Sequence, residues 1–219
     1  MKGKLTLSPS FVIPAILTDN KTQFVERLNF AETIGAVHID VINNDFCSGS
    51  SLPIDDWPNI NVSYSEAHLM VKEPIGYLEK LATKGVRRAI VHVESDFDLI
   101  ELRNTARMHD ILLGYAIKPE TDLFTCKQFL EPNSYILIMG VNPGASAQEQ
   151  LPQTNSAVSY VKQSTMSRIT VSVDGGVNTQ TIKLNRNALA DFVVASSAIF
   201  NQLNPTEAFN RLAGENDER

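Results

Sequence analysis

The sequence repeats one unit eight times: a short apolar run typical of a buried strand, followed in most cases by a longer amphipathic stretch typical of a helix. Such alternation predicts parallel pairing, since each helix carries the chain back along the sheet before the next strand begins. We expect strands at residues 11–17, 36–42, 65–71, 87–93, 112–118, 135–141, 169–175 and 191–197. We expect helices at residues 20–34, 73–84, 96–109, 122–130, 156–164, 178–189 and 205–212.

Eight strand–helix units close into a (β/α)8 barrel, and a length of 219 residues suits one such domain. The sequence therefore predicts a single TIM barrel over residues 1–219, with a charged tail at about 214–219 that should fray. The second helix is the exception, because residues 43–61 carry no helical stripe. We expect a long loop there with at most one helical turn. An open, doubly wound sheet is the alternative architecture.

Charge and composition exclude several classes of partner. The net charge of -6 argues against nucleic-acid binding, which needs a basic surface. No apolar run reaches the ~20 residues of a membrane span. The two cysteines, Cys47 and Cys126, form no CxxC pair, so a reducing compartment is expected. The sequence predicts a cytoplasmic protein without a nucleic-acid or membrane partner.

Two histidines and two carboxylates share one phase of the predicted strands. Residues two apart in a strand face the same side, so His38 and Asp40 point inward together. His68 in the third strand and Asp174 at the end of the seventh face inward as well. Barrel interiors are filled mainly by branched apolar side chains, and a buried carboxylate without a partner is costly. The set suits one divalent metal ion, such as zinc, manganese, iron(II) or cobalt, whereas a hydrogen-bonded polar plug is the alternative reading.

The last two strands predict a phosphate site. Strand seven ends with Asp174, Gly175 and Gly176, and strand eight ends with Ser196 and Ser197. Barrels of this type often hold phosphate after these two strands, where glycines let the backbone approach an anion. We expect the phosphate to lie against these two glycines and two serines.

Three other inward or strand-end residues are weaker candidates. His92 and Glu94 also face inward from the fourth strand, where we expect an ordinary core histidine with satisfied hydrogen bonds. Lys118 ends the fifth strand and has the position of a Schiff-base lysine, although an ion-paired or solvated lysine is the simpler expectation.

Seven short motifs in a fixed order make the chain resemble the ribulose-phosphate 3-epimerase family from about residue 10 to residue 209. They are IPAIL, HIDV, AHLM, AIKP, IMGVNPG, VDGG and SSAIF. The resemblance implies that His38, Asp40, His68 and Asp174 hold the metal. It further implies that Asp40 and Asp174 are the acid–base pair, that His38 and His68 contact a small phosphorylated ketose, and that the chain forms a homo-oligomer.

The chain departs from the family pattern around the predicted mouth. Ala15 stands where the family has serine, and INNDFCSG at residues 42–49 replaces MDGxFVPN, so that Ile42 replaces a methionine. Met70 and Met139 match two other methionines at the mouth. The glycine-rich GFGGQ loop that closes over the substrate in the family is replaced by Gly144, Ala145, Ser146, Ala147 and Gln148. We expect an altered lid above a complete ligand set.

The resemblance implies a metal-dependent 3-epimerase that interconverts D-ribulose 5-phosphate and D-xylulose 5-phosphate through proton removal and return at C3. Two alternatives stay open at this point. One is a barrel that binds a sugar phosphate without catalysis, which the altered lid would favour. The other is a lyase, either an aldolase acting through Lys118 or a decarboxylase-like barrel. The latter carry a lysine two residues after the strand-two aspartate, where this chain has Ile42.

Overall fold

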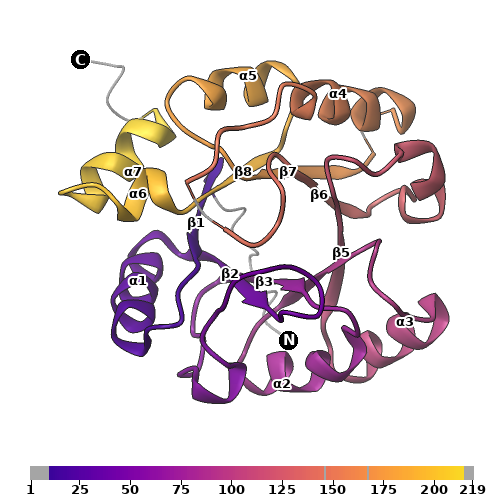
Figure 1. The fold of residues 1–219 in the computed structure, drawn as a ribbon, viewed down its shortest axis with the longest axis horizontal. Helices are drawn as coiled ribbons and strands as arrows, with labels where there is room; N and C mark the ends of the chain where they lie inside the picture. The colour runs from indigo at the N-terminus through magenta and orange to yellow at the C-terminus, as the bar shows by residue number, and fades with distance from the viewer. Residues whose placement is uncertain (1–9, 146, 167, 215–219) are drawn as a thin grey trace, which may run out of the picture.

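Eight parallel strands close into a barrel in chain order, each paired with its neighbours in sequence and the last with the first (Figure 1). The computed structural model describes residues 10–145, 147–166 and 168–214. The strands are β1 (Val12–Ile16), β2 (Ala36–Ile42), β3 (Tyr64–Met70), β4 (Arg88–His92), β5 (Leu112–Ile117), β6 (Tyr135–Met139), β7 (Thr170–Asp174) and β8 (Phe192–Ala195). The predicted barrel is confirmed, and the alternative of an open sheet is wrong because β1 pairs with β8.

The helices form a layer around this ring (Figure 1). They are α1 (Lys21–Ile34), α2 (Leu78–Thr83), α3 (Leu99–Met108), α4 (Thr154–Ser164), α5 (Thr181–Asn187), α6 (Ser197–Phe200) and α7 (Pro205–Ala213). The described residues also contain the 3-10 helices η1 (Ile54–Asp56), η2 (Ile75–Tyr77) and η3 (Leu123–Phe129). The predicted loop between β2 and β3 is confirmed, with η1 as its one helical turn.

Local capping chemistry sets the ends of the best-defined helices. The side chain of Asn20 accepts the backbone N–H of Gln23 at the start of α1, and Gly35 ends that helix in the left-handed conformation with φ of 80°. Asn204 caps α7 in the same way, Pro205 occupies its first turn, and Gly214 closes it. The remainder of the predicted frayed tail, residues 215–219, lies outside the described residues.

Two predicted helices differ from the structure. Residues 73–84 form η2 followed by the short α2, because Gly76 lies in the first turn and favours the α-helix poorly. Residues 122–130 form η3 rather than an α-helix. Its backbone bonds run to the carbonyl three residues back, as from Thr125 to Asp122. Phe124, Thr125 and Phe129 are weaker α-helix formers than leucine or lysine.

The apolar residues separate into an outer and an inner cluster. The outer one lies between strands and helices and includes Val37, Ile39 and Val41 of β2. The inner cluster inside the barrel is small and consists of Ala15, Ile90, Ala116, Tyr135, Leu137, Met139 and Val194. Fully buried polar side chains occupy the rest of the interior, among them His38, Glu66, His68, His92 and Ser172. The predicted inward phase of the polar residues in β2 and β3 is thereby confirmed.

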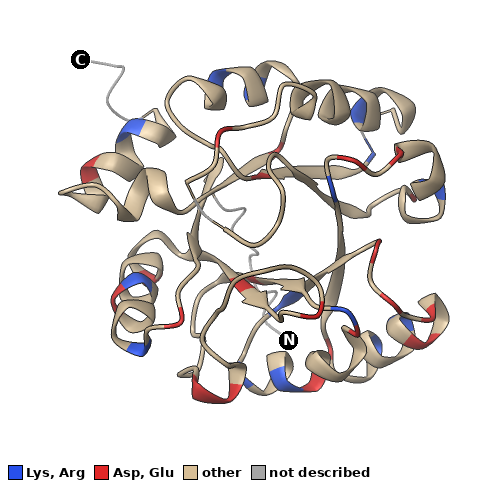
Figure 2. Cartoon of the chain, viewed as in Figure 1, with Lys and Arg blue, Asp and Glu red and all other residues tan. Residues whose placement is uncertain are grey.

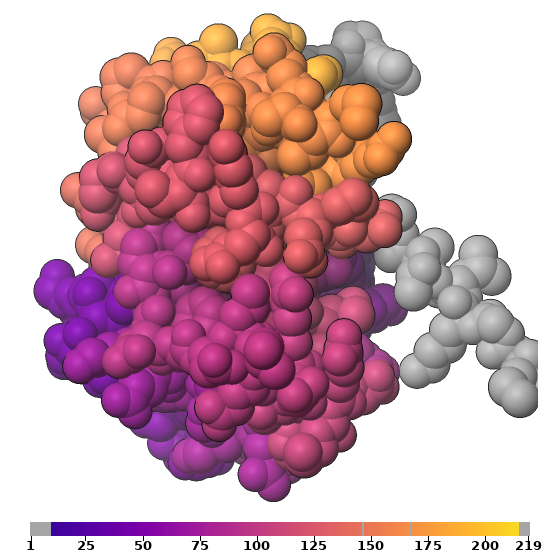
Figure 3. Space-filling view, turned by 90° about the vertical axis from the view of Figure 1, so that its right-hand side faces the viewer, coloured from indigo at the N-terminus to yellow at the C-terminus, as the bar shows by residue number. Residues whose placement is uncertain are grey.

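Charged residues of both signs are spread over the outer helices and loops, as Figure 2 shows. Seen from the side covered by α3 and η3, successive segments form bands in chain order, as expected for a ring built from consecutive units (Figure 3). None of the helices in the described part of the chain is long and apolar enough to cross a membrane.

Candidate active site

The parallel register of β2 and β3 brings the first part of the site together. His38 is the partner of Glu66, and Asp40 is the partner of His68, two residues further along the same pair of strands. Asp174 ends β7 and reaches the same place from the other side of β1. One nitrogen or oxygen atom each from His38, Asp40, His68 and Asp174 lies within 4.8 Å of the other three.

These four side chains point two nitrogens and two oxygens at a common position. Asp40 Oδ1 lies 3.1 Å from His68 Nδ1 and 3.4 Å from His38 Nε2. Asp174 Oδ2 lies 3.4 Å from His68 Nδ1 and 3.9 Å from His38 Nε2. His38 Nε2 is fully buried and makes no hydrogen bond within the described residues. A buried nitrogen without a donor partner, facing two carboxylates, fits a divalent cation between them.

The charge balance of the site favours added positive charge. Burial alone would lower the pKa of His38 and His68, but the neighbouring carboxylates outweigh burial and raise both values. Burial would likewise raise the pKa of Asp40, but the two histidines outweigh it and hold that pKa below its ordinary range. The groups titrate together, and either protons or a metal ion can supply the positive charge that the two carboxylates attract.

Glu66 holds His38 from behind. Its Oε1 lies 2.8 Å from His38 Nδ1 and accepts a hydrogen bond from the Tyr135 hydroxyl at 3.2 Å. Its Oε2 accepts from Tyr64 at 2.8 Å and lies 3.5 Å from Arg88. Burial would raise the pKa of Glu66, but His38, Arg88 and Tyr64 outweigh it and lower the value. Such outer partners fix which imidazole nitrogen faces a metal.

His68 is held by a second histidine. His92 Nε2 lies 2.9 Å from His68 Nε2, and His92 Nδ1 lies 2.9 Å from Glu94 Oε2. Burial is the main reason that the pKa of His92 falls to about 4, so this ring is neutral at physiological pH. The expected core histidine with satisfied hydrogen bonds is thus found, but one of its partners is a member of the site itself.

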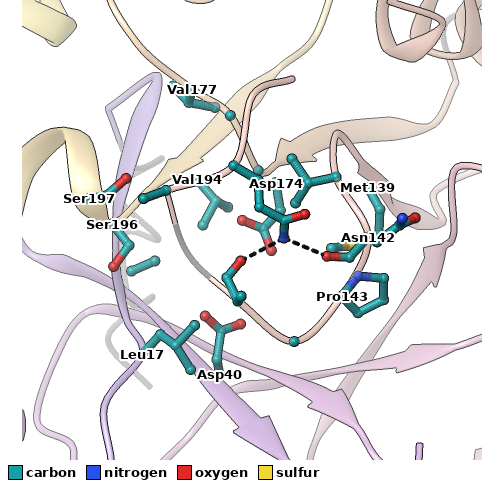
Figure 4. A pocket seen from close by; sticks show the side chains of 18 of the residues that line it. Leu17, Asp40, Met139, Asn142, Pro143, Asp174, Val177, Val194, Ser196 and Ser197 are labelled. Carbon is teal, nitrogen blue, oxygen red and sulfur yellow. Dashed lines mark hydrogen bonds between the residues drawn. The ribbon is translucent and has the colours of Figure 1, made fainter. Parts of the chain in front are cut away.

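A pocket opens above the two aspartates at the carboxyl ends of the strands (Figure 4). The predicted residues among those that line it are Ala15, Asp40, Met70, Met139, Gly144, Ala145, Ala147, Asp174, Gly175, Gly176, Ser196 and Ser197. Ser146, predicted in the same loop, lies outside the described residues. His38 and His68 are fully buried beneath the pocket and do not line it. Leu17, Asn142 and Pro143 also line it and were not predicted.

The two glycines after β7 serve loop packing. A side chain on Gly175, whose φ is 103°, would collide with Val141, and one on Gly176, whose φ is 67°, would collide with the backbone of Gln150. The side chain of Gln150 also donates to the Gly175 carbonyl at 3.2 Å. The sequence predicts these glycines for close approach of the backbone to an anion, which stays a prediction. In the structure the loop after β6 also occupies the space that side chains at both positions would need.

The loops after β2 and β6 meet across the mouth, where Figure 1 shows the loop after β6 reaching over the centre of the ring. Gly49 and Gly144 both have positive φ, of 126° and 118°, and a Cβ on Gly49 would lie 2.5 Å from the Gly144 carbonyl oxygen. Gln148 fastens the second loop by donating to the carbonyls of Asn142 and Ala145 at 2.8 and 2.9 Å (Figure 4). The loop after β6, which is the altered lid, is therefore held by its own hydrogen bonds and by its contact with the loop after β2.

Solved structures with similar folds include two enzymes named for phosphorylated compounds. A 3-hexulose-6-phosphate synthase superposes with a TM-score of 0.69 at 16% identity, covering 93% of this chain and 98% of its own. The orotidine 5'-monophosphate decarboxylase from Sulfolobus solfataricus gives a TM-score of 0.61 at 14% identity, covering 95% of this chain and 98% of its own. At these identities the likeness supports the fold alone.

Similarity in sequence is more specific. The ribulose-phosphate 3-epimerase of Chlamydia muridarum is 30% identical over 216 residues, which cover 93% of this chain and 95% of the relative. The enzymes of the same name from Schizosaccharomyces pombe and Bacillus subtilis are 28% and 26% identical, covering 87% and 93% of this chain and 76% and 98% of their own lengths. The model of the ribulose-phosphate 3-epimerase family matches residues 11–200. The predicted class, an isomerase acting on carbohydrates, is thereby confirmed, and the chain belongs to the ribulose-phosphate 3-epimerase family.

Proposed function

We propose that this chain is a metal-dependent 3-epimerase of a ketose phosphate that interconverts D-ribulose 5-phosphate and D-xylulose 5-phosphate. One observation carries the proposal. The carboxylates of Asp40 and Asp174 come from strands that are not neighbours, both line the pocket, and both lie beside the same two buried histidines. An inversion at carbon needs two such groups, one for each face of the substrate.

The residues that would hold the metal are His38 through Nε2, His68 through Nδ1, and Asp40 and Asp174 through one carboxylate oxygen each. When bound, a divalent ion such as zinc, iron(II), manganese or cobalt supplies a Lewis acid for the negative charge that develops on substrate oxygens. The donor set of two imidazoles and two carboxylates fits each of these ions.

The two aspartates divide the proton transfer between them. The C3 proton is acidic because the electron pair left behind can move onto the adjacent C2 carbonyl oxygen, giving a planar enediolate. Asp40 removes that proton from one face, and Asp174 delivers a proton to the other face as the electron pair returns to C3. In the reverse reaction the two residues exchange roles. No redox cofactor is needed, because substrate and product have the same oxidation state.

Apolar side chains form one part of the pocket wall. Ala15, Met70, Met139 and Val194 line it beside the two carboxylates. Apolar walls keep water away from the developing charge, which strengthens the interaction of that charge with the site. In place of the family's serine, Ala15 offers the substrate no hydroxyl.

We propose that the phosphate binds at the end of the pocket that is formed by Gly175, Gly176, Ser196 and Ser197. Figure 4 shows the two serines on the side of the pocket opposite Asn142 and Pro143. Replacing Ser197 with Asp should raise KM for D-ribulose 5-phosphate by at least about tenfold, because like charges repel. Ser197→Asn is the matched control of the same size without charge. Equal KM values for the Asp and Asn variants would count against this location.

The contact between the two loops should contribute to substrate binding. Gly144→Ala puts a methyl group into the Ser48 carbonyl and strains a backbone with φ of 118°. Strain of this kind costs roughly 1–3 kcal/mol, so we expect KM to rise about tenfold while the metal stays bound. Gly76→Ala is the control, since no atom lies within 4 Å of its added methyl group. An unchanged KM for Gly144→Ala would show that the loop contact is not used in binding.

A metal assay and a proton-exchange assay together test the proposed function. The purified protein should contain one divalent ion per chain and should exchange the C3 proton of D-ribulose 5-phosphate with solvent in heavy water. A protein that binds metal and sugar phosphate without exchange would be the non-catalytic alternative.

The aldolase alternative gains no support, because Lys118 places its Nζ 4.0 Å from the centre of the Phe46 ring and is not among the residues that line the pocket.

We also propose a cytoplasmic location, which is supported by a relative from Oryza sativa subsp. japonica that is named as a cytoplasmic isoform and is 26% identical. A homo-oligomer stays a prediction that rests on family resemblance.

A further inference from the structure

We propose that His92 and Glu94 are positioning residues of the metal site, which fix the tautomer and the orientation of His68. The inference rests on the proposed metal site and extends it to β4. Neither residue is among those that line the pocket. Among the four proposed ligands, His92 makes its hydrogen bond to His68.

A hydrogen-bonded chain runs from His68 on β3 through His92 on β4 to the loop after β5. It runs from His68 to His92 at 2.9 Å and from His92 to Glu94 at 2.9 Å, and His68 Nδ1 lies 3.1 Å from Asp40 Oδ1 at its inner end. Glu94 is anchored in turn, because its Oε1 accepts the backbone N–H of Lys118 at 2.9 Å and the hydroxyl of Thr121 at 2.5 Å. Both histidines are fully buried, and the Glu94 side chain is 19% exposed.

The direction of each hydrogen bond follows from the last acceptor. An ionised Glu94 accepts only, so His92 must carry its proton on Nδ1 and donate it. A neutral His92 then has a lone pair on Nε2, which can accept only if His68 carries its proton on Nε2. His68 Nδ1 is left with the lone pair, and that nitrogen faces Asp40 and Asp174. The chain thus presents to the metal the one form of His68 that can bind it.

The stagger of the barrel explains why these residues meet. His68 pairs with Ile90 in β4, so His92 lies two residues further toward the mouth. His92 pairs with Ala116 in β5, so Lys118 again lies two residues further on. Strands that tilt around a barrel axis bring such diagonal neighbours into contact. The contact therefore follows from the fold and is independent of any flexible loop.

Phe46 covers this chain on the loop after β2. Its ring lies 4.7 Å from the His92 ring between centres, and Lys118 Nζ lies 4.0 Å from the Phe46 ring. A cover of this kind keeps water from competing for the His92 nitrogens, which strengthens the hydrogen bonds beneath it.

The test measures metal affinity by chelator competition with zinc in four variants of the full chain. His92→Phe keeps the ring and its packing but removes both nitrogens, and we expect zinc to bind about 10- to 100-fold more weakly. His92→Gln retains an acceptor for His68 and a donor for Glu94, so it should bind zinc more tightly than His92→Phe. A residue that merely fills space would give the reverse order. Glu94→Gln should weaken zinc binding, whereas Asp96→Asn, which removes an exposed carboxylate from the same loop, should not.

A double variant tests whether Glu94 acts through His92 or whether the two residues affect zinc binding independently. If Glu94 acts through His92, adding Glu94→Gln to His92→Phe should change zinc affinity less than about twofold. Full additivity would overturn the proposal. Nitrogen-15 spectra of the parent histidines provide a measurement that needs no variant to fold, and they should show His92 protonated on Nδ1. Protonation of His92 on Nε2 would overturn the proposal.

The outcomes distinguish this inference from the proposed function. A parent protein that takes up no metal would overturn both. A parent that binds metal and exchanges the C3 proton, with unchanged zinc affinity in His92→Phe and Glu94→Gln, would overturn the positioning role alone.

Discussion

Epimerisation should fall about 1000-fold or more when either Asp40 or Asp174 is replaced by Asn, because each change keeps the size of the side chain but removes its ability to carry a proton. Partial exchange should separate the two. A variant with one working carboxylate can still wash the C3 proton of one epimer into solvent, since forming the enediolate needs only that face. We therefore expect Asp40→Asn to retain exchange with one epimer and Asp174→Asn with the other, measured in heavy water by proton spectroscopy.

Metal occupancy decides how such losses are understood. Both aspartates are also proposed ligands, so each variant must be assayed for metal before activity is compared. Loss of turnover with metal retained supports proton transfer, and Asp96→Asn controls for the removal of one negative charge. Full epimerase activity in either Asn variant would refute the pairing of these two residues.

The second large effect is expected at the metal. His68→Ala removes one of four donors and also leaves His92 Nε2 without its partner. We expect metal affinity to fall by more than the roughly 10- to 100-fold that follows loss of an outer hydrogen-bond partner, and activity to fall with it. Metal content after dialysis and chelator competition are the measurements. His109→Ala is the control, because it removes a histidine at the end of α3 that is not one of the proposed ligands. This variant should bind the metal as the parent does.

Metal removal from the parent should also lower its thermal stability. A ligand that binds only the folded state stabilises it, by about 2.7 kcal/mol when its concentration is 100 times its Kd. The parent should therefore unfold at a lower temperature after chelation and recover when metal is added. Stoichiometric metal in His68→Ala, or an unchanged Tm on chelation, would remove the basis of the site.

The sequence was sufficient to predict the parts of the site that depend on strand periodicity. His38 and Asp40 in one strand, and His68 in the next, were predicted to face inward because alternation in a strand has a strict period of two. The role of Glu66 was missed, although its spacing from His68 equals that of His38 from Asp40. Two such pairs in neighbouring parallel strands are a recognisable signal for a ligand histidine and its carboxylate partner.

Features that depend on the stagger of strands or on contacts between distant loops could not be predicted from the sequence. His92 reaches His68 diagonally, which requires the tilt of the closed barrel. Gly49 and Gly144 come from loops almost a hundred positions apart, and only the folded mouth shows that neither has room for a side chain. Local propensity also failed at η3, where a weak helical pattern settled into the tighter 3-10 form.

The seven-residue register between β2 and β3 has a consequence for the fidelity of folding. A slip of one residue would turn His38 and Asp40 outward among the apolar side chains that face the helices, where they would have neither water nor partners. A slip of two would keep the inward phase but place His38 opposite His68, with Glu66 opposite Ala36 instead of His38. Both errors leave buried polar groups without hydrogen-bond partners, and each unsatisfied group costs roughly 1–3 kcal/mol of folding free energy. The residues proposed to perform the chemistry should therefore also penalise misaligned chains, so variants that replace them with apolar residues are expected to refold with more heterogeneous strand pairing than the parent.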